Sequence, residues 1–348
     1  MSLLYYISGH GFGHAGRCAQ TARLLNQRHP EIPVYIRTMA NARMFANLGP
    51  HVHYAPVAID RGAIEIDAMR IDWPATLAQV RELIATKDAL IAAETRFIQQ
   101  NGIRLIIADV PFLAGYIAQA AGVPCYAQCN FMWDWIYQPH TDDQALLDAI
   151  RQGYRLMTGQ LRLPYPHPCD HFKKVLDVPL ICAPSNISKS QARKILGIAA
   201  SEQRPIIFAA MRGGTSPALH ARLATLSPNY LLLTELDLAR HPQLSFWDIL
   251  QVCDVVVSKP GHGIVTDCCS LGVALLHPPR NGFREDELIL SASAEHMRQR
   301  PIPLSDYSQG NWKPHLDALL AQPRLAPATN TNGREWVADF IASQWISA

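Results

Sequence analysis

Residues 254–287 read DVVVSKPGHGIVTDCCSLGVALLHPPRNGFREDE, and this stretch decides the fold class. The β-branched run at 254–258 is typical of a buried parallel strand. A loop containing Gly261 and Gly263 follows, residues 264–271 have a helical pattern, and residues 273–277 form the next strand. The order strand, glycine loop, helix, strand predicts a βαβ unit, which places a helix N-terminus at the carboxyl edge of a parallel sheet.

The loop of this unit has the composition of a phosphate site. Loop amides and the helix dipole favour an anion at the start of the helix. Asp267 shares the helix face of the loop, and its carboxylate leans back toward the helix N-terminus, where it can accept hydrogen bonds from the hydroxyls of a ribose. Asp286 and Glu287 follow the next strand at the same edge and could bind further hydroxyls. The stretch predicts a site for a nucleotide that carries a sugar, although strand–glycine–helix units are common in α/β proteins.

The same alternation runs through both halves of the chain. A strand at 3–7 ends in GHGFGH (9–14), and a strand at 205–210 ends in Arg212-Gly213-Gly214. Five prolines between 163 and 184 suit neither a long helix nor a central strand. We predict an α/β protein with two doubly wound, Rossmann-like domains at 1–165 and 185–325, joined by a linker at 166–184 that contains an edge strand, and followed by a linker and helix at 326–348. Their strand-end loops would face a cleft.

Composition excludes several classes of function. The charge is nearly balanced, with 31 Lys+Arg against 29 Asp+Glu, so nucleic-acid binding is not indicated, although a local basic groove is not excluded. The 8 cysteines form no CxxC pair, no secretory leader opens the sequence, and no apolar segment approaches the roughly 20 residues that span a bilayer. The histidines lack a convergent set of further ligands, so we expect no metal site. We predict a reduced, soluble, cytoplasmic protein.

The second half resembles the GT-B glycosyltransferases, most closely the branch that contains the peptidoglycan N-acetylglucosaminyltransferase. The segments GHGIVTD (261–267) and LHPPRNGFREDE (276–287) are similar to that family's G-x-x-x-x-S-E…P…DQ/QQ pattern. The resemblance implies that Asp267 replaces the ribose-binding Glu and that Asp286 lies where the donor sugar is held. Gly213-Gly214 resembles the glycine loop of the nucleotide domain. Because 267 is Asp rather than Glu and 287 is Glu rather than Gln, the donor stays open.

The first half resembles the same fold. GHGFGH is similar to the family's GGTGGH loop, with His14 at its last position. The segments SGHGFGHAGR (8–17), IADVPFLAG (107–115) and NFMWDWIY (130–137) resemble the glycosyltransferase-like region that precedes the sugar-kinase domain of plant arabinokinases, and related bacterial stand-alone proteins. The printed sequence ends without a kinase module. The resemblance covers most of the chain and implies a GT-B fold, but it says little about the acceptor.

We expect a glycosyltransferase (a hexosyl- or pentosyltransferase) that moves a sugar from a nucleotide diphosphate sugar, UDP-linked by the resemblance, to an unknown acceptor hydroxyl. The transfer is expected to be inverting and to need no metal, and the only small molecule implied besides the acceptor is the donor substrate. A nucleotide-sugar epimerase of the same fold, with Glu285 or Asp134 as an added acid or base, and a non-catalytic nucleotide-sugar sensor are the alternatives. The oligomeric state is open.

Each candidate residue has a functional interpretation and a structural one. The general base is His14 or Asp109, and a neutral imidazole suits pH 7 better than an exposed carboxylate. His10 and His262 contact the ligand or shape their turns. The tryptophans at 133 and 135 are a platform for a planar or sugar acceptor, or they are packed in the core. The donor-binding candidates are Arg212, Gly213, Gly214, Lys259, Gly261, His262, Gly263, Asp267, Glu285 and Asp286, and the acceptor-side candidates are His10, Gly11, Gly13, Asn130, Trp133 and Asp134.

Overall fold

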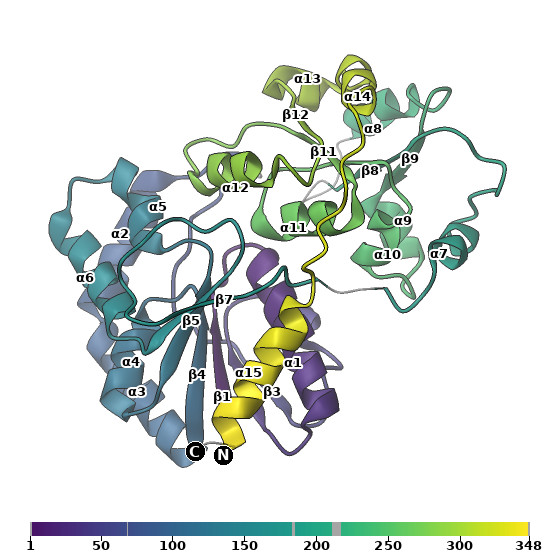
Figure 1. Ribbon diagram of the computed structural model, residues 1–348. Helices are drawn as coiled ribbons and strands as arrows, with labels where there is room; N and C mark the ends of the chain where they lie inside the picture. The colour runs from purple at the N-terminus through teal and green to yellow at the C-terminus, as the bar shows by residue number, and fades with distance from the viewer. Residues whose placement is uncertain (1, 68, 183–184, 211–216, 347–348) are drawn as a thin grey trace. The chain divides into compact units, whose positions relative to one another are not determined.

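The computed structural model describes residues 2–67, 69–182, 185–210 and 217–346. The chain forms two compact units (Figure 1). Unit 1 comprises residues 1–66, 71–181 and 332–348, and unit 2 comprises residues 67–70 and 182–331. Apart from the short segment 67–70, the chain leaves unit 1 once, builds unit 2, and returns to unit 1 for its last helix.

Unit 1 is built on a 7-stranded sheet in the order β3-β2-β1-β4-β5-β6-β7, with every neighbouring pair parallel. The strands at the centre of this order, at 2–7, 103–109 and 125–129, are buried on both faces and are mostly apolar runs rather than alternating patterns. The strands are β1 (Ser2–Ile7), β2 (Val34–Arg37), β3 (Val52–Ala55), β4 (Ile103–Asp109), β5 (Cys125–Cys129), β6 (Gly159–Arg162) and β7 (Val175–Asp177). The helices are α1 (Gly13–Arg28), α2 (Trp73–Ala85), α3 (Lys87–Gln100), α4 (Leu113–Ala121), α5 (Trp133–Tyr137), α6 (Gln144–Arg155) and α15 (Gly333–Ile346), with short 3-10 turns η1 (Ala42–Phe45) and η2 (Gln138–His140).

The last helix completes the core of unit 1. Figure 1 shows α15 (yellow) lying beside α1 (purple), and Val337, Ala338 and Ile341 are buried in the same apolar cluster as Leu25 of α1. At the start of α15, a Cβ on Gly333 would meet the Pro179 oxygen at 2.1 Å. Only glycine allows the backbone to come this close. Of the segment expected as a separate terminal element, 326–348, the part from residue 332 onward thus belongs to unit 1.

Unit 2 is built on a 5-stranded parallel sheet in the order β12-β11-β10-β8-β9. One face of the sheet packs on α8, α13 and α14 around the buried Trp312. The strands are β8 (Ile206–Ala209), β9 (Leu231–Thr234), β10 (Val255–Val257), β11 (Ala274–His277) and β12 (Gln299–Pro301). The helices are α7 (Lys189–Ile195), α8 (Pro217–Ala224), α9 (Glu235–Arg240), α10 (Phe246–Leu250), α11 (His262–Leu271), α12 (Glu285–Ser293), α13 (Leu304–Gln309) and α14 (Lys313–Leu320).

The predicted βαβ unit is present as β10, α11 and β11. Its helix ends at Gly272 with φ 69°. This left-handed conformation is a common way to end a helix. The edge strand predicted within the linker at 166–184 is present as β7, which continues the sheet of unit 1, so most of the predicted linker belongs to that unit. As the last strand in the order, β7 lies at a sheet edge, where flanking prolines are tolerated.

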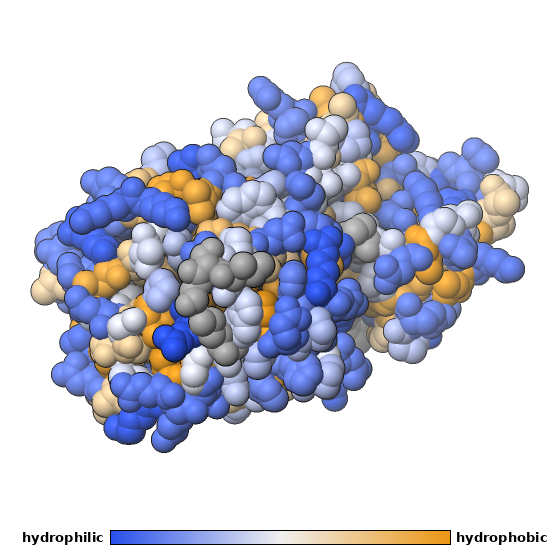
Figure 2. All heavy atoms as spheres, turned by 60° about the horizontal axis from the view of Figure 1, so that its bottom comes forward, coloured by the Kyte–Doolittle hydropathy of each residue, from blue (hydrophilic) through white to orange (hydrophobic). Residues whose placement is uncertain are grey.

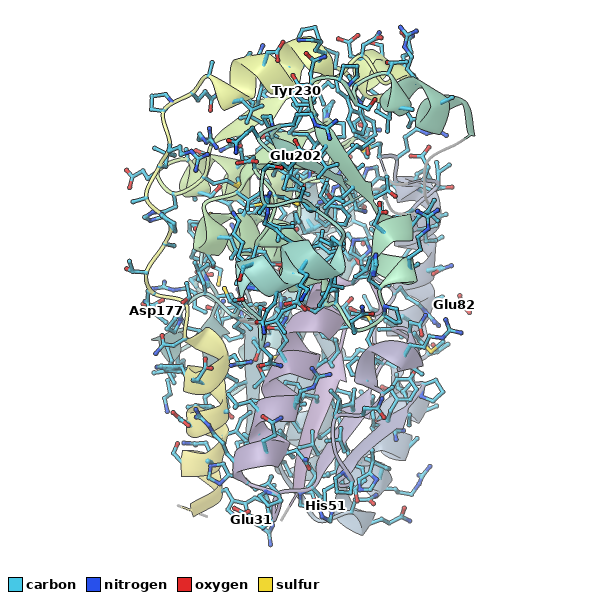
Figure 3. All side chains as sticks on the ribbon, turned by 90° about the vertical axis from the view of Figure 1, so that its right-hand side faces the viewer. Glu31, His51, Glu82, Asp177, Glu202 and Tyr230 are labelled. Atoms are coloured by element: carbon cyan, nitrogen blue, oxygen red, sulfur yellow. The ribbon has the colours of Figure 1, made fainter. Side chains whose placement is uncertain are left out.

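The surface is mostly polar. On the face drawn in Figure 2, hydrophilic side chains predominate and the hydrophobic ones lie in small separate groups. Glu31, Glu82 and Asp177 point outward from unit 1 in Figure 3. Within the described residues, no helix is both long enough and apolar enough to span a membrane.

Candidate active site

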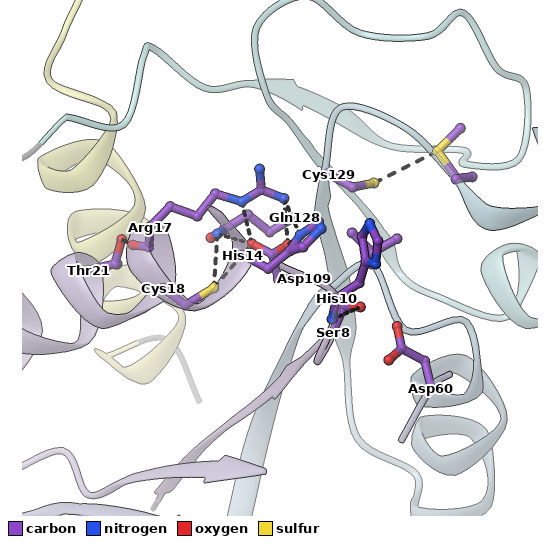
Figure 4. A network of polar contacts seen from close by, with 12 residues as sticks. Ser8, His10, His14, Arg17, Cys18, Thr21, Asp60, Asp109, Gln128 and Cys129 are labelled. Atoms are coloured by element: carbon purple, nitrogen blue, oxygen red, sulfur yellow. Dashed lines mark hydrogen bonds and ion pairs between the residues drawn. The ribbon is translucent and has the colours of Figure 1, made fainter. Parts of the chain in front are cut away.

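The strongest polar cluster of unit 1 lies where β1 and β4 end. These strands are neighbours, and Ile7 pairs with Asp109 at their carboxyl ends. The glycine loop after β1 leads into the first turn of α1, which carries His14. There, His14 Nδ1 lies 2.7 Å from Asp109 Oδ1, and both side chains are buried (Figure 4). The structure therefore joins the two residues that the sequence proposed as rival bases into one hydrogen-bonded pair.

The Asp109 carboxylate has further partners on both oxygens. Arg17, one helical turn after His14, donates from Nε to Oδ2 at 2.6 Å and from Nη2 to Oδ1 at 2.5 Å. Cys18 Sγ and Gln128 Nε2 each lie 3.1 Å from Oδ2. Burial alone would raise the pKa of Asp109, but the Arg17 guanidinium and the hydrogen bonds from His14 and Arg17 outweigh it and hold that pKa below its ordinary value. Asp109 is thus a fixed anion with no open side for a substrate.

This pairing also decides the tautomer of His14. An ionised carboxylate only accepts hydrogen bonds, so the contact with Asp109 places the imidazole proton on Nδ1. Arg17 Nη2 also lies 3.0 Å from Nδ1, and since a guanidinium only donates, this is a contact between two donors that both serve Asp109. The lone pair of neutral His14 is therefore on Nε2, the atom not bound to Asp109.

The residue after Asp109 has a strained backbone. Val110 has φ 82°, although it is β-branched and fully buried. Such a conformation persists only where the surroundings impose it. Tyr154 Oη donates to the Val110 oxygen at 2.8 Å and accepts from the Trp133 backbone N at 3.1 Å. The turn that presents Asp109 is thus held from α6.

A second buried carboxylate, Asp60, lies beside the same loop. Its Oδ2 accepts from Trp133 Nε1 at 3.1 Å, and Ser8 and the Gly9 backbone also bond to it. Burial raises the pKa of Asp60, while these bonds and the nearby His14 oppose the rise. Figure 4 shows Asp60 beside Ser8 and His10. Sequence reasoning missed Asp60 because it lies in an irregular segment without a motif, whereas Arg17 was within reach at the i+3 position after His14.

The acceptor-side prediction is corrected for three residues. Trp133 is 0 % exposed and stacks on Tyr137 at 5.2 Å between ring centroids, so it is part of the core. Asn130 is also fully buried. Asp134 accepts from Arg151 Nε at 3.3 Å and lies 3.1 Å from His171 Nε2, which removes it from the His14 cluster. Local sequence does not distinguish a packed aromatic cluster from an open one.

The remaining acceptor-side candidates do lie at the glycine loop. Gly11 has φ 71°, a conformation that favours glycine, and Gly13 begins α1 in an exposed position. His10 is half-buried, and its ring centroid lies 6.5 Å from that of His14. His10 Nδ1 lies 3.2 Å from the Ala63 oxygen. The segment after β3 thus contacts the loop that carries His10 and leads into the helical turn of His14.

Unit 2 has its own group of candidate residues at the carboxyl edge of its sheet. Gly261 caps α11, a Cβ on it would meet nothing within 4 Å, and His262 is the buried first residue of the helix. Lys259 and Gly263 lie in the same loop and first turn. Backbone amides at this N-terminus suit a phosphate. Arg212, Gly213 and Gly214 lie outside the described residues.

Asp267 lies on α11, and within the described residues its carboxylate makes no hydrogen bond or ion pair. The side chain is half-buried, and this burial raises the pKa of Asp267 to about 8. A carboxylate held in this way is costly unless a ligand supplies hydrogen-bond donors.

The acidic pair after β11 is present, but one member is already paired. Arg280 donates from Nε to Asp286 Oδ2 at 2.9 Å and from Nη2 to Oδ1, and Glu285 lies 3.9 Å from Nη2. Burial raises the pKa of Asp286 to about 6, with Arg280 and Lys259 opposing the rise. The loops after β10 and β11 thus bring Lys259, Arg280, Glu285 and Asp286 into one electrostatic group. Within the described residues no set of three or more His, Cys, Asp or Glu side chains is placed to hold a metal ion.

Solved structures with the same arrangement are glycosyltransferases of the GT-B fold. The glycotransferase of kitacinnamycin and the calicheamicin glycosyltransferase each superpose with a TM-score of 0.64 at 13% identity, covering 99% and 98% of this chain and 98% of theirs. A Phytolacca americana protein complexed with UDP-2-fluoro-glucose and pterostilbene superposes with a TM-score of 0.58 at 12% identity, over 99% of both chains. The chain thus has the predicted GT-B fold.

Sequence comparison gives a relative of higher identity. The chain is 25% identical over 338 residues to the L-arabinokinase of Arabidopsis thaliana, covering 91% of this chain and 32% of that protein. It therefore spans about a third of the length of that relative. No family model matches the chain. The arabinokinase likeness predicted from the motifs is present, while the peptidoglycan branch stays a prediction.

Proposed function

We propose that this protein transfers a sugar from a nucleotide diphosphate sugar, UDP-linked, to an acceptor hydroxyl with inversion at the anomeric carbon. The observation that carries the proposal is the buried hydrogen bond of 2.7 Å between His14 and Asp109. It lies at the strand ends where α/β folds bind ligands, in a chain whose fold neighbours are glycosyltransferases.

His14 is assigned as the general base. As the acceptor oxygen forms its bond to the anomeric carbon, its proton passes to His14 Nε2, and the bond from that carbon to the diphosphate oxygen breaks. Asp109 holds the ring in the required tautomer and stabilises the imidazolium that forms. Asp109 is a positioning residue rather than the base, because Arg17 and the other donors occupy both of its oxygens.

The leaving group is assigned to unit 2. The diphosphate departs with the bonding electron pair, and the amides at the N-terminus of α11 stabilise its charge together with Lys259. Asp267 binds the ribose hydroxyls, and Asp286 binds the donor sugar. No step in this scheme calls for a metal ion.

The test is a panel of UDP-, dTDP-, GDP-, ADP- and CMP-linked sugars. Each is incubated with the protein and a pool of small hydroxyl compounds, and mass spectrometry detects products heavier by one sugar. We expect transfer with one nucleotide class and a loss of about 10²–10⁴-fold in His14→Ala. His51→Ala is the matched control, because His51 is exposed and precedes β3 at the opposite end of the strands (Figure 3).

The panel also tests the alternatives from the sequence. An epimerase would convert the donor without an acceptor, and a sensor would bind a nucleotide sugar without turnover. Neither has a specific observation in its favour, since Asp134 is bound by Arg151 and His171 and Glu285 is 5 % exposed. Binding with no transfer, or no binding of any nucleotide sugar, would refute the proposal.

A further inference from the structure

The turn that follows β11 contains a self-contained ion pair. Arg280 forms a bidentate contact with Asp286, six residues later, through Nε and Nη2. The guanidinium also stacks on Phe283, with Cζ 3.9 Å from the ring centroid. The side chains of Arg280 and Asp286 are only 5% and 8% exposed. One short segment therefore fixes both the position and the orientation of the Asp286 carboxylate.

The pairing leaves acceptor capacity on Asp286. A carboxylate has about four lone-pair sites, and Arg280 occupies one on each oxygen. Asp286 can thus still accept a hydrogen bond on each oxygen, provided that it is ionised. A protonated carboxyl group would keep only part of this capacity, because one oxygen would become a donor.

The charges around Asp286 are finely balanced. Burial raises its pKa and Glu285 raises it further, whereas Arg280 and Lys259 lower it, and the result is about 6. Asp286 is therefore ionised at pH 7 with a margin of only about one unit. Arg280 is the closest cation, so its removal would leave a buried carboxyl group that is neutral at pH 7.

We propose that Arg280 is a specificity-determining positioning residue: it locks Asp286 as a two-oxygen hydrogen-bond acceptor for adjacent hydroxyls of the donor sugar. The ligand class is a nucleotide-linked sugar with two free neighbouring hydroxyls. This inference rests on the proposed function, because it assumes that unit 2 binds the donor. The inference goes beyond the proposed function because it assigns recognition of the sugar to the Arg280–Asp286 pair, in which the arginine itself need not touch the ligand.

The experiment separates sugar binding from nucleotide binding. Isothermal titration measures Kd for UDP-glucose and for UDP alone at pH 7.0 and pH 9.0, on wild type, Arg280→Met and Arg280→Lys, with the other nucleotide classes used if UDP does not bind. At pH 7.0, Arg280→Met should weaken UDP-glucose by about tenfold or more and leave UDP within about twofold. Arg280→Lys, which keeps the charge, should recover part of the loss.

The pH arm distinguishes positioning from general damage. At pH 9.0 Asp286 ionises even without Arg280, so UDP-glucose binding by Arg280→Met should return toward wild type, whereas Asp286→Asn should stay weak at both pH values. Arg204→Met is the control, since it breaks another arginine–carboxylate pair of unit 2, with Glu202 (Figure 3), at a less buried site. It should change neither affinity.

The outcomes separate the two proposals. If UDP binds and Arg280→Met leaves the ratio of the two affinities unchanged, the role of Arg280 is wrong and the proposed function stands. If Arg280→Met weakens UDP and UDP-glucose equally at both pH values, Arg280 is structural only and the inference is overturned. If no nucleotide binds wild type, the proposed function and this inference fall together.

Discussion

The ion pair between Arg17 and Asp109 allows a quantitative test of the His14 site. Asp109→Asn keeps the shape of the side chain but leaves the Arg17 guanidinium, only 7% exposed, without its anion. Breaking a buried pair from one side costs about 3–5 kcal/mol, because the remaining charge stays desolvated. Arg17→Met should cost a similar amount through the buried Asp109. In the double variant no charge is left behind, so the loss should be smaller than the sum of the two single losses by about 2 kcal/mol or more.

The assay is urea unfolding at pH 7.5, combined with hydrogen exchange of peptides from α1 and β4, because a chain of two units need not unfold in one step. Since the pKa of Asp109 is lower in the folded state than in the unfolded state, its contribution is present above about pH 4 and is lost as the pH falls through the folded-state pKa. The cost of Asp109→Asn should therefore be constant from pH 5 to 8.

If the losses of unfolding free energy in the two single variants add up to the loss in the double variant, with a coupling under about 0.5 kcal/mol, the reasoning is refuted. Such additivity is typical of sites that do not interact. The same variants serve the functional proposal. In Asp109→Asn the amide can donate to Nδ1 and move the imidazole proton to Nε2, so sugar transfer should fall by about 10³–10⁴-fold even where the protein remains folded.

Three further predictions concern other parts of the chain. Because the pKa of Asp267 is about 8, binding of ribose hydroxyls to its ionised form releases a proton, so nucleotide affinity should rise from pH 6 to pH 8 by up to about tenfold per pH unit. Asp267→Asn should abolish this slope in isothermal titration. A flat wild-type profile would contradict the prediction. Tyr154→Phe removes the donor to the Val110 oxygen and should cost about 1–3 kcal/mol in thermal unfolding, with Tyr116→Phe, whose Oη bonds the Ala149 oxygen from a part-buried site, as the milder control. Gly333→Ala should displace the start of α15 from the Pro179 oxygen and raise hydrogen exchange in α1. Gly102→Ala is the control for backbone strain alone, because a Cβ there meets nothing within 4 Å although φ is 58°. Equal exchange in both variants would disprove the role of the Gly333–Pro179 contact.

The fold could be predicted because its signals are local. Most of the parallel strands are apolar runs that end in a glycine loop or a polar residue, and the helices that follow them have their own period. The limits of the units could not be predicted in this way. The packing of α15 on α1 depends on a shared apolar cluster that contains both Leu25 and Ile341. These residues are more than 300 positions apart in sequence, and no periodicity reveals that they come together. The prolines near β7 indicated a linker with an edge strand within it, but they did not indicate that this strand joins the sheet of unit 1.

The site was predicted in part for the same reason. His14 and Asp109 follow recognisable strand ends, so both were found, but their roles depend on Arg17, which contacts the carboxylate from the next helical turn. Trp133 was read as a possible platform because sequence does not report burial. Asp60 forms hydrogen bonds with Ser8, the Gly9 backbone and Trp133. Tertiary structure brings these partners together, so the sequence contains no motif spacing that would reveal them.

The return of the chain to unit 1 makes unit 2 a cassette. Ile181 and Asn332 pair as an antiparallel bridge, and the Gly333 backbone N donates to the Leu180 oxygen at 3.0 Å. The residues at which the chain leaves and re-enters unit 1 are therefore adjacent. The contacts between them close the whole intervening segment as one loop, so the entropic cost of loop closure arises once. Recombination at these two breakpoints would replace the whole segment 182–331 without disturbing the unit that carries His14 and Asp109, with Met69 as a further contact to match. The His14–Asp109 pair and the α11 loop can thus be inherited separately by exchanging one continuous piece of the gene.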